Sequence, residues 1–244
     1  MHKNQSLKKK LGLQAFFDGE KLVGNDFDVK SITPVGIDDM RESLLNKTLY
    51  CPELFYTIYE DCDYQKLLKN IDINMSIYVL NCGVAGIEFL KTLSYQNQSY
   101  PKIFEILQGN GIIIFTDSKE DIFLLRVKSG DKIIIPANAY SVVCNIKFSP
   151  LILAEFSYKK QKSKKTLEDM QGMPYYVISK NSKPAIVRNP VYKNVKKVKK
   201  IKWMEITKKH NISPKTPIFK QLLRKYEKMD WLFKKNYSYT DTDS

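Results

Sequence analysis

Residues 130–145 read GDKIIIPANAYSVVCN, two short apolar runs separated by a turn. The first run is rich in isoleucine and ends at Pro136, and the second begins at Tyr140 and contains two valines. β-Branched and aromatic residues favour strands, whereas Gly, Pro and Asn favour turns. The stretch therefore predicts two β-strands joined by a turn that contains Asn138.

The same alternation of apolar runs and turns extends in both directions, from about Leu49 to Tyr158. Regularly spaced short strands of this kind predict an all-β antiparallel sandwich or barrel, of which the jelly roll is one form. The further strands are expected near residues 54–59, 75–80, 87–93, 103–107, 111–116, 121–127 and 151–156.

Charge divides the chain into regions. The net charge is +14, and residues 191–244 contribute 15 Lys and Arg against 5 Asp and Glu. We predict an N-terminal arm and irregular segment over 1–48, with one helical turn near Asp38 to Leu45. A β-barrel with its closing segment follows over 49–190, and a basic, largely helical C-terminal extension over 191–244. The lysine-rich run 159–165 is expected to be a solvated loop.

The extension contains an amphipathic pattern that begins at Thr216-Pro217, a good helix start. Apolar residues then recur at helical spacing, with a basic face elsewhere on the wheel. The apolar face would pack on the barrel or on a partner subunit. Alternatively, the extension would bind nucleic acid, with residues 206–229 as a superficial helix-turn-helix, or an acidic protein. The candidate contacts for a polyanion or partner are Lys220, Arg224, Lys225 and Lys228.

Cysteine usage and hydropathy suggest a location in the cell. The four cysteines are scattered, without a C-x-x-C pair, which favours a reducing compartment over a disulfide framework. No apolar run approaches the length of a membrane span. We expect a cytoplasmic protein with no membrane contact.

The opening stretch resembles the second motif of the cupin family, which reads Gly, five residues, Pro, one residue, Gly, two residues, His, three residues, Asn. Gly130, Pro136 and Asn145 occupy their places. Asn138 replaces the second glycine, and Ser141 replaces the metal-binding histidine. Asparagine tolerates left-handed backbone geometry, so the turn is still expected to form.

The first cupin motif supplies two histidines and a glutamate. This chain resembles it only in spacing, because other residues stand at the ligand positions. Counted back from Gly109, the histidine positions hold Tyr95 and Asn97, and the glutamate position holds Lys102. Phe89 replaces the opening glycine. The flanks resemble the cupin-type glucose-6-phosphate isomerases, and the resemblance covers roughly residues 35–193. It is carried by GVAGIEFLKTLSYQNQ (83–98), IFEILQGNG (103–111) and GMPYYVISKNSKPAIVRNPVYK (172–193).

The resemblance implies a cupin jelly-roll barrel, a homodimer, and a divalent metal such as iron or zinc that assists sugar-phosphate isomerisation. Such ions prefer imidazole nitrogen and carboxylate oxygen. Neutral Tyr95, Asn97 and Ser141 and cationic Lys102 are poor substitutes, and the two histidines of the chain, His2 and His210, lie outside the barrel region. We therefore expect no metal or other cofactor.

Other residues leave alternatives open. Glu88 and Glu105 lie on expected strands and are weak candidates for a catalytic base, and the alternative is that they face solvent. Thr92 and Ser94 match family positions that hold the substrate's phosphate. Lys102 would join them in a pocket for a sugar phosphate or another anion if it points inward, and otherwise it extends to solvent at a loop.

Three functions follow. The leading hypothesis is a catalytically degenerate isomerase-like cupin that acts as a non-enzymatic binding or structural protein, so the chain is not expected to be an enzyme. The first alternative is an active sugar-phosphate isomerase in carbohydrate metabolism. The second is a nucleic-acid-binding regulator that uses the basic extension.

Overall fold

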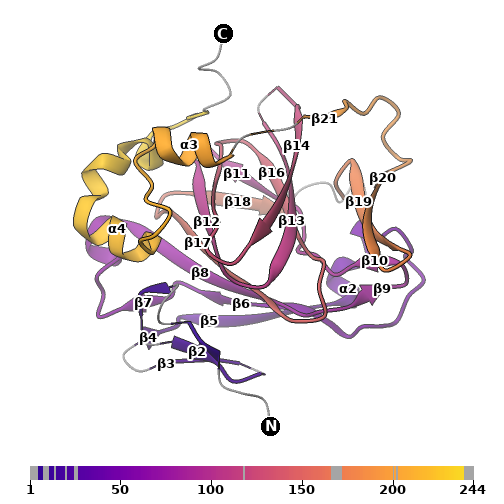
Figure 1. The fold of residues 1–244 in the computed structure, drawn as a ribbon, viewed down its shortest axis with the longest axis horizontal. Coiled ribbons are helices and arrows are strands. Elements are labelled where there is room, and N and C mark those ends of the chain that lie inside the picture. Colours follow the sequence, from indigo (N-terminus) through magenta and orange to yellow (C-terminus); the bar gives the residue numbers. More distant parts are fainter. Residues whose placement is uncertain are drawn as a thin grey trace.

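The computed structural model describes residues 5–7, 11–13, 15–19, 21–24, 27–117, 119–165, 172–199, 201 and 203–238 (Figure 1). A large antiparallel sheet with the strand order β15-β12-β17-β8-β6-β5 forms one wall of the fold. Its strands are β5 (Ser31–Gly36), β6 (Leu54–Glu60), β8 (Ile73–Leu80), β12 (Lys102–Gln108), β15 (Lys132–Ile135) and β17 (Leu151–Tyr158).

A second large sheet, with the order β18-β11-β16-β13-β14-β21, forms the opposite wall. One continuous apolar cluster includes residues of both sheets, among them Ile77, Phe115 and Phe156. This arrangement confirms the expected all-β jelly-roll barrel. The strands are β11 (Tyr95–Gln98), β13 (Asn110–Thr116), β14 (Ile122–Lys128), β16 (Tyr140–Asn145), β18 (Lys162–Lys165) and β21 (Val198–Lys199).

Smaller elements surround the barrel. A sheet with the order β20-β19-β10-β9 lies at the right end in Figure 1, and β2 and β3 lie at the bottom. The strands are β1 (Gln5–Ser6), β2 (Ala15–Phe17), β3 (Leu22–Gly24), β4 (Phe27–Asp28), β7 (Asp63–Tyr64), β9 (Val84–Ala85), β10 (Glu88–Phe89), β19 (Tyr175–Lys180) and β20 (Lys183–Arg188). The short helices are α2 (Ile37–Met40), η1 (Arg41–Ser43) and η2 (Lys69–Ile71).

The C-terminal extension contains α3 (Trp203–Lys209), α4 (Ile218–Lys225) and η3 (Tyr226–Phe233), which lie against the left side of the barrel in Figure 1. Helix α4 begins at Ile218, close to the start predicted at Thr216-Pro217, but Pro217 and not Thr216 is its N-cap and no side chain caps it. Its apolar residues Ile218, Phe219 and Leu222 are buried and belong to the same cluster as the barrel core. Of the open alternatives, the described extension thus packs on its own barrel.

The two motif turns form as expected even where the family's residues are replaced. Asn138 adopts a left-handed conformation with φ of +60°, which the missing glycine would otherwise supply. Gly109 has φ of +84°, and a Cβ at this position would lie 2.8 Å from the carbonyl oxygen of Pro150. The frame of both motifs therefore persists as backbone geometry.

Three expectations need correction. Residues 31–36, predicted to be irregular, form β5 and pair with β6 in the barrel sheet. Within the run 159–165, predicted to be a solvated loop, residues 162–165 form β18 and pair with β11. The run 87–93 is regular strand only at Glu88–Phe89. Among the described residues, no helix is long and apolar enough to cross a membrane.

Candidate functional site

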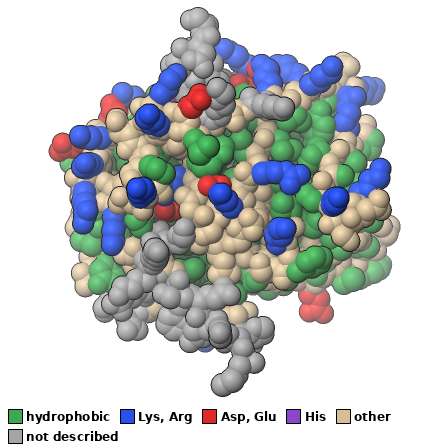
Figure 2. Space-filling model, in the orientation of Figure 1, with side chains coloured by type: hydrophobic (Ala, Val, Ile, Leu, Met, Phe, Trp, Pro, Cys, Tyr) green, Lys and Arg blue, Asp and Glu red, His purple; other side chains and the backbone are tan. Residues whose placement is uncertain are grey.

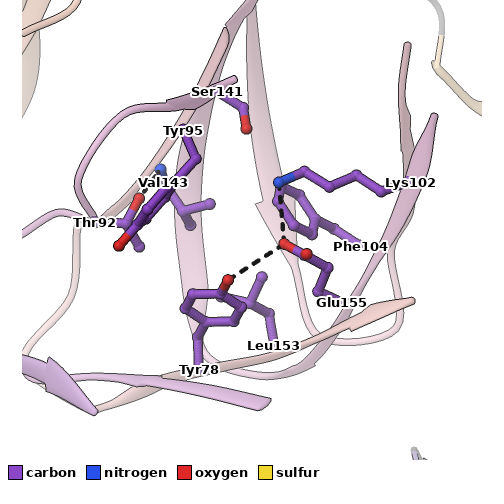
Figure 3. Close-up of a pocket in the computed structure, with 9 residues that line it drawn as sticks. All are labelled: Tyr78, Thr92, Tyr95, Lys102, Phe104, Ser141, Val143, Leu153 and Glu155. Atoms are coloured by element: carbon purple, nitrogen blue, oxygen red, sulfur yellow. Dashed lines mark hydrogen bonds and ion pairs between the residues drawn. The ribbon is translucent and has the colours of Figure 1, made fainter. Parts of the chain in front are cut away.

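Three of the four positions that match the family's metal ligands meet inside the barrel (Figure 3). Tyr95 and Ser141 face each other as directly paired residues of β11 and β16. Lys102 begins β12 on the opposite sheet, and its residue is only 2% exposed. The three side chains line one small cavity together with Tyr78, Thr92, Phe104, Val143, Leu153 and Glu155.

A buried ion pair occupies the centre of this cavity. The Lys102 ammonium lies 3.0 Å from a carboxylate oxygen of Glu155, and the same oxygen accepts a longer hydrogen bond, 3.4 Å, from the Tyr78 hydroxyl. The register explains the pairing: Phe104 lies opposite Glu155 across β12 and β17, so Lys102, two residues before Phe104, is the diagonal neighbour on the same face. The ammonium also lies 4.7 Å from the centre of the Phe104 ring.

The ion pair and the aromatic rings leave little room. The cavity has a volume of about 10 Å³ for water centres, which is close to the minimum for one water molecule. Sites that enclose small-molecule ligands are usually several hundred Å³ in size. The side chains of Tyr78, Tyr95 and Phe104 thus fill the space that a sugar phosphate would need.

The residues in the cavity do not fit the divalent metal that the family resemblance implies. The position of one ligand is held by an ammonium, which repels a cation. Glu155, the only carboxylate among the described lining residues, is neutralised by that ammonium. The remaining polar groups are neutral hydroxyls, which are weak ligands for transition metals. Among the described residues, no three His, Cys, Asp or Glu side chains gather as a metal-binding group.

The tyrosines of the cavity remain protonated. Burial raises the pKa of Tyr78 well above its ordinary value, and the nearby Glu155 carboxylate adds to the effect. Burial also raises the pKa of Tyr95. Both phenols are therefore neutral hydrogen-bonding groups at physiological pH, and neither supplies a phenolate base.

The other predicted positions have structural partners. Asn97 is fully buried outside the cavity lining, and its side-chain nitrogen donates to the Pro136 carbonyl at 3.0 Å. Thr92 lines the cavity, but its hydroxyl oxygen already accepts the backbone N–H of Val143 at 3.1 Å. Ser94 is not among the cavity residues and contacts the sulfur of Met173. The three candidates for phosphate binding therefore do not converge as a group.

Glu88 and Glu105 are buried, contrary to the expectation that they face solvent, and both lie outside the cavity. Glu105 points away from the interior because it alternates with the inward-facing Phe104. Its carboxylate lies 3.2 Å from the Lys132 ammonium and accepts the backbone N–H of Ile218 at 2.9 Å, which attaches α4 to the barrel.

Glu88 performs a similar role at the other end of the barrel. Its carboxylate pairs with Lys91 at 2.5 Å and accepts the backbone N–H of Leu45 at 2.9 Å. The Lys91 ammonium also donates to the Ser43 carbonyl. Both glutamates thus hold segments distant in sequence together, and neither has a place beside the cavity as a catalytic base.

Of the two alternatives for Lys102, the structure shows the inward one, because Glu155 holds its ammonium inside the barrel. Sequence reasoning missed Glu155 and Tyr78. A signal for Glu155 was present: it interrupts the apolar run LILAEFSY (151–158) and shares the parity of Leu151 and Leu153. A charged residue on the inward face of a central strand requires a partner of opposite charge.

The predicted basic residues of the extension lie together on the surface. Lys220, Arg224, Lys225 and Lys228 all line one pocket beside α4. The helix-turn-helix interpretation fits this arrangement poorly, since the N-terminal backbone of α4 binds Glu105 and its apolar face is buried on the barrel. A recognition helix needs that N-terminal part free to enter a DNA groove.

Comparison with known proteins identifies the family. Three solved structures are similar at low identity. Procruciferin, an 11S globulin from Brassica napus, is 14% identical with a TM-score of 0.39, and the match covers 49% of this chain and 29% of that one. Oxalate decarboxylase from Lactobacillus farciminis in a formate complex is 17% identical (TM-score 0.35, 43% of this chain and 28% of that one), and vicilin from Capsicum annuum is 20% identical (TM-score 0.35, 50% of this chain and 33% of that one). The chain thus spans a third or less of their lengths.

A sequence search of curated proteins gave no match. The model of the glucose-6-phosphate isomerase (GPI) family matches residues 31–194, which is well over half of the 244 residues and includes every strand of the barrel except β21. This span agrees with the region of resemblance found from the motifs. The chain belongs to the glucose-6-phosphate isomerase family.

Proposed function

We propose that this family member does not isomerise sugar phosphates and acts as a non-enzymatic binding or structural protein. The observation that carries the proposal is the Lys102–Glu155 ion pair, which occupies the barrel interior together with aromatic rings. The ammonium and the carboxylate satisfy each other, so neither is available to a metal or a substrate without breaking the pair.

The chemistry of isomerisation supports the same view. Moving hydrogen between two adjacent carbons of a sugar requires a base that removes a proton and an electrophile that stabilises the resulting oxyanion. Glu155 is the only carboxylate among the described residues of the cavity lining, and its Oε2 accepts hydrogen bonds from both Lys102 and Tyr78. A carboxylate held in this way has no space beside it for a sugar carbon.

We also propose that the protein is cytoplasmic and forms a homodimer. All four cysteines are free thiols, and Cys62 and Cys144 are buried, which suits a reducing compartment. The homodimer rests on family analogy. Strand β5, at the edge of its sheet, exposes Ile32 and pairs with β6 alone among the described residues. Light scattering would test the dimer.

An isomerase assay tests the central proposal. The full-length protein is purified, incubated with iron, zinc or manganese salts, and supplied with glucose 6-phosphate or fructose 6-phosphate. We expect no turnover above that of a Glu155→Gln variant. Turnover that tracks the wild-type protein and disappears in Glu155→Gln, while persisting in the surface control Glu227→Gln, would instead establish the active isomerase.

A further inference from the structure

A second pocket lies outside the barrel, on the solvent side of the C-terminal extension. Its volume for water centres is about 140 Å³, an order of magnitude more than the barrel cavity. It is formed by α4, the start of η3 and the loop before α4. Its described lining residues are Asn211, Ser213, Thr216, Lys220, Gln221, Arg224, Lys225, Lys228 and Met229, none of which is acidic.

The positive charge of this pocket comes from α4 and the start of η3. Lys220 and Arg224 lie four residues apart on α4, where like charges repel, and Lys225 and Lys228 follow at the junction with η3. The nearby acids do not relieve the repulsion: Glu227 is absent from the lining, and Asp230 pairs with Lys234 at 2.6 Å. Lys and Arg side chains gather over α4 at the left edge of Figure 2.

The polar floor of the pocket is fixed in place by a buried glutamine. Gln221 is 8% exposed, and its amide nitrogen donates to the carbonyls of Ser213 and Thr216 at 3.1 and 2.6 Å. Its amide oxygen accepts the backbone N–H of Ser213 at 2.7 Å. These three bonds hold the loop against α4, so the hydroxyls of Ser213 and Thr216 are positioned before any ligand arrives.

The barrel and the N-terminal segment fix the remaining wall. Helix α4 is attached at its first residue by Glu105, as described above. The aliphatic part of Lys220 lies against Gly12, where a Cβ would come within 3.1 Å of the lysine Cε. Gly12 has φ of +83°, a conformation that favours glycine. The pocket is thus a preorganised feature of the folded chain.

We propose that this pocket binds a small phosphorylated molecule. A phosphate dianion accepts paired hydrogen bonds from an arginine and is attracted by the charge of lysines. Four cations, with no carboxylate among the described lining residues, suit a dianion better than a single carboxylate. The hydroxyl and amide groups of Ser213, Thr216 and Asn211 suit the uncharged polar part of such a ligand. The pocket is smaller than the several hundred Å³ of sites that enclose a whole ligand, so it suits a phosphate group and the atoms next to it, with the rest of the molecule in solvent.

A small molecule fits this pocket better than a nucleic-acid strand. Strand-binding proteins combine an extended basic groove with aromatic side chains on which the bases stack. The described lining of this pocket contains no aromatic residue. The site is also separate from the barrel cavity, so the inference stands whether or not the barrel is catalytic.

Titration calorimetry with inorganic pyrophosphate as the probe tests the proposal on the full-length protein. The test variant is Arg224→Ala, and the matched control is Arg188→Ala, which removes an exposed arginine of β20 at the opposite end of the molecule. We expect measurable binding at low salt that weakens about tenfold in Arg224→Ala, the loss of one charge-assisted contact, and changes less than about twofold in the control.

Three outcomes would overturn the proposal. They are no pyrophosphate binding by the wild-type protein, equal weakening by both substitutions, or binding of a single-stranded oligonucleotide that pyrophosphate does not displace. The last result would assign the surface to nucleic acid. Thermal melts of both variants confirm that each is folded, which is expected because both side chains are exposed.

Discussion

Replacing Lys102 with methionine leaves Glu155 buried without its cation. The two residues are 2% and 8% exposed, and their charged atoms are 3.0 Å apart. Removal of one partner of such a buried pair costs about 3–5 kcal/mol. Because the Tyr78 hydroxyl still donates to the carboxylate, we expect the lower end, about 3 kcal/mol, and a fall in melting temperature of about 6–12 °C for a chain of this size.

The double variant Lys102→Met/Glu155→Leu separates charge from packing. With both charges removed, we expect the free energy of unfolding to return to within about 1 kcal/mol of the wild type or to exceed it, because neither charge must then be buried. Urea unfolding of the single variants, the double variant and the wild type gives the coupling energy between the two residues.

A surface pair provides the matched control. Lys159 and Asp72 lie 3.5 Å apart with side chains 60% and 59% exposed, so Lys159→Met is expected to cost less than about 1 kcal/mol. If Lys102→Met costs no more than this control, the ion pair is not buried as described. The account of a barrel interior occupied by charge would then be refuted.

Three further predictions use the same unfolding and labelling methods. Gly111→Ala should destabilise the protein by about 1–3 kcal/mol, because a Cβ there would lie 2.7 Å from Leu151 and 2.8 Å from the Cys144 carbonyl; a smaller loss would show that the strands are not so close. Burial lowers the pKa of His210, so the unfolded state binds a proton at this residue more readily than the folded state does. The contribution of His210 to the free energy of unfolding should therefore be complete above about pH 6.5 and decrease below it. His210→Gln should remove part of this decrease. Burial raises the pKa of the Cys62 and Cys144 thiols to about 12, so a thiol reagent at about pH 8 should label the native protein only at Cys51 and Cys82, and rapid labelling of all four would contradict the fold.

The barrel was predictable because its signals are local. Short runs of β-branched residues and the turns between them are read from a few neighbouring residues, and Asn138 adopts the left-handed conformation that its chemistry allows. The helix after Pro217 was equally predictable from the helical spacing of its apolar residues, although Pro217 and not Thr216 is its N-cap and no side chain caps it. By contrast, the sequences of β5 and β18 show only weak apolar patterns. They form strands because each pairs with a neighbouring strand, β5 with β6 and β18 with β11.

The site was less predictable because its side chains are placed by distant partners. The direction of Lys102 depends on Glu155, which is 53 residues away in the sequence. Glu105 is buried only because α4, more than 100 residues later, covers it. Composition and periodicity do not encode such pairings, so both residues remained ambiguous between inward and solvent-facing positions until the register of the strands was known.

The most direct test of the central claim combines elemental analysis of the purified protein with the isomerase assay described above, with and without added divalent metal. We expect less than stoichiometric metal and no turnover under either condition, because Lys102 and Glu155 occupy the interior. Stoichiometric metal together with turnover that requires Glu155 would contradict it and restore this chain to the active isomerases of its family.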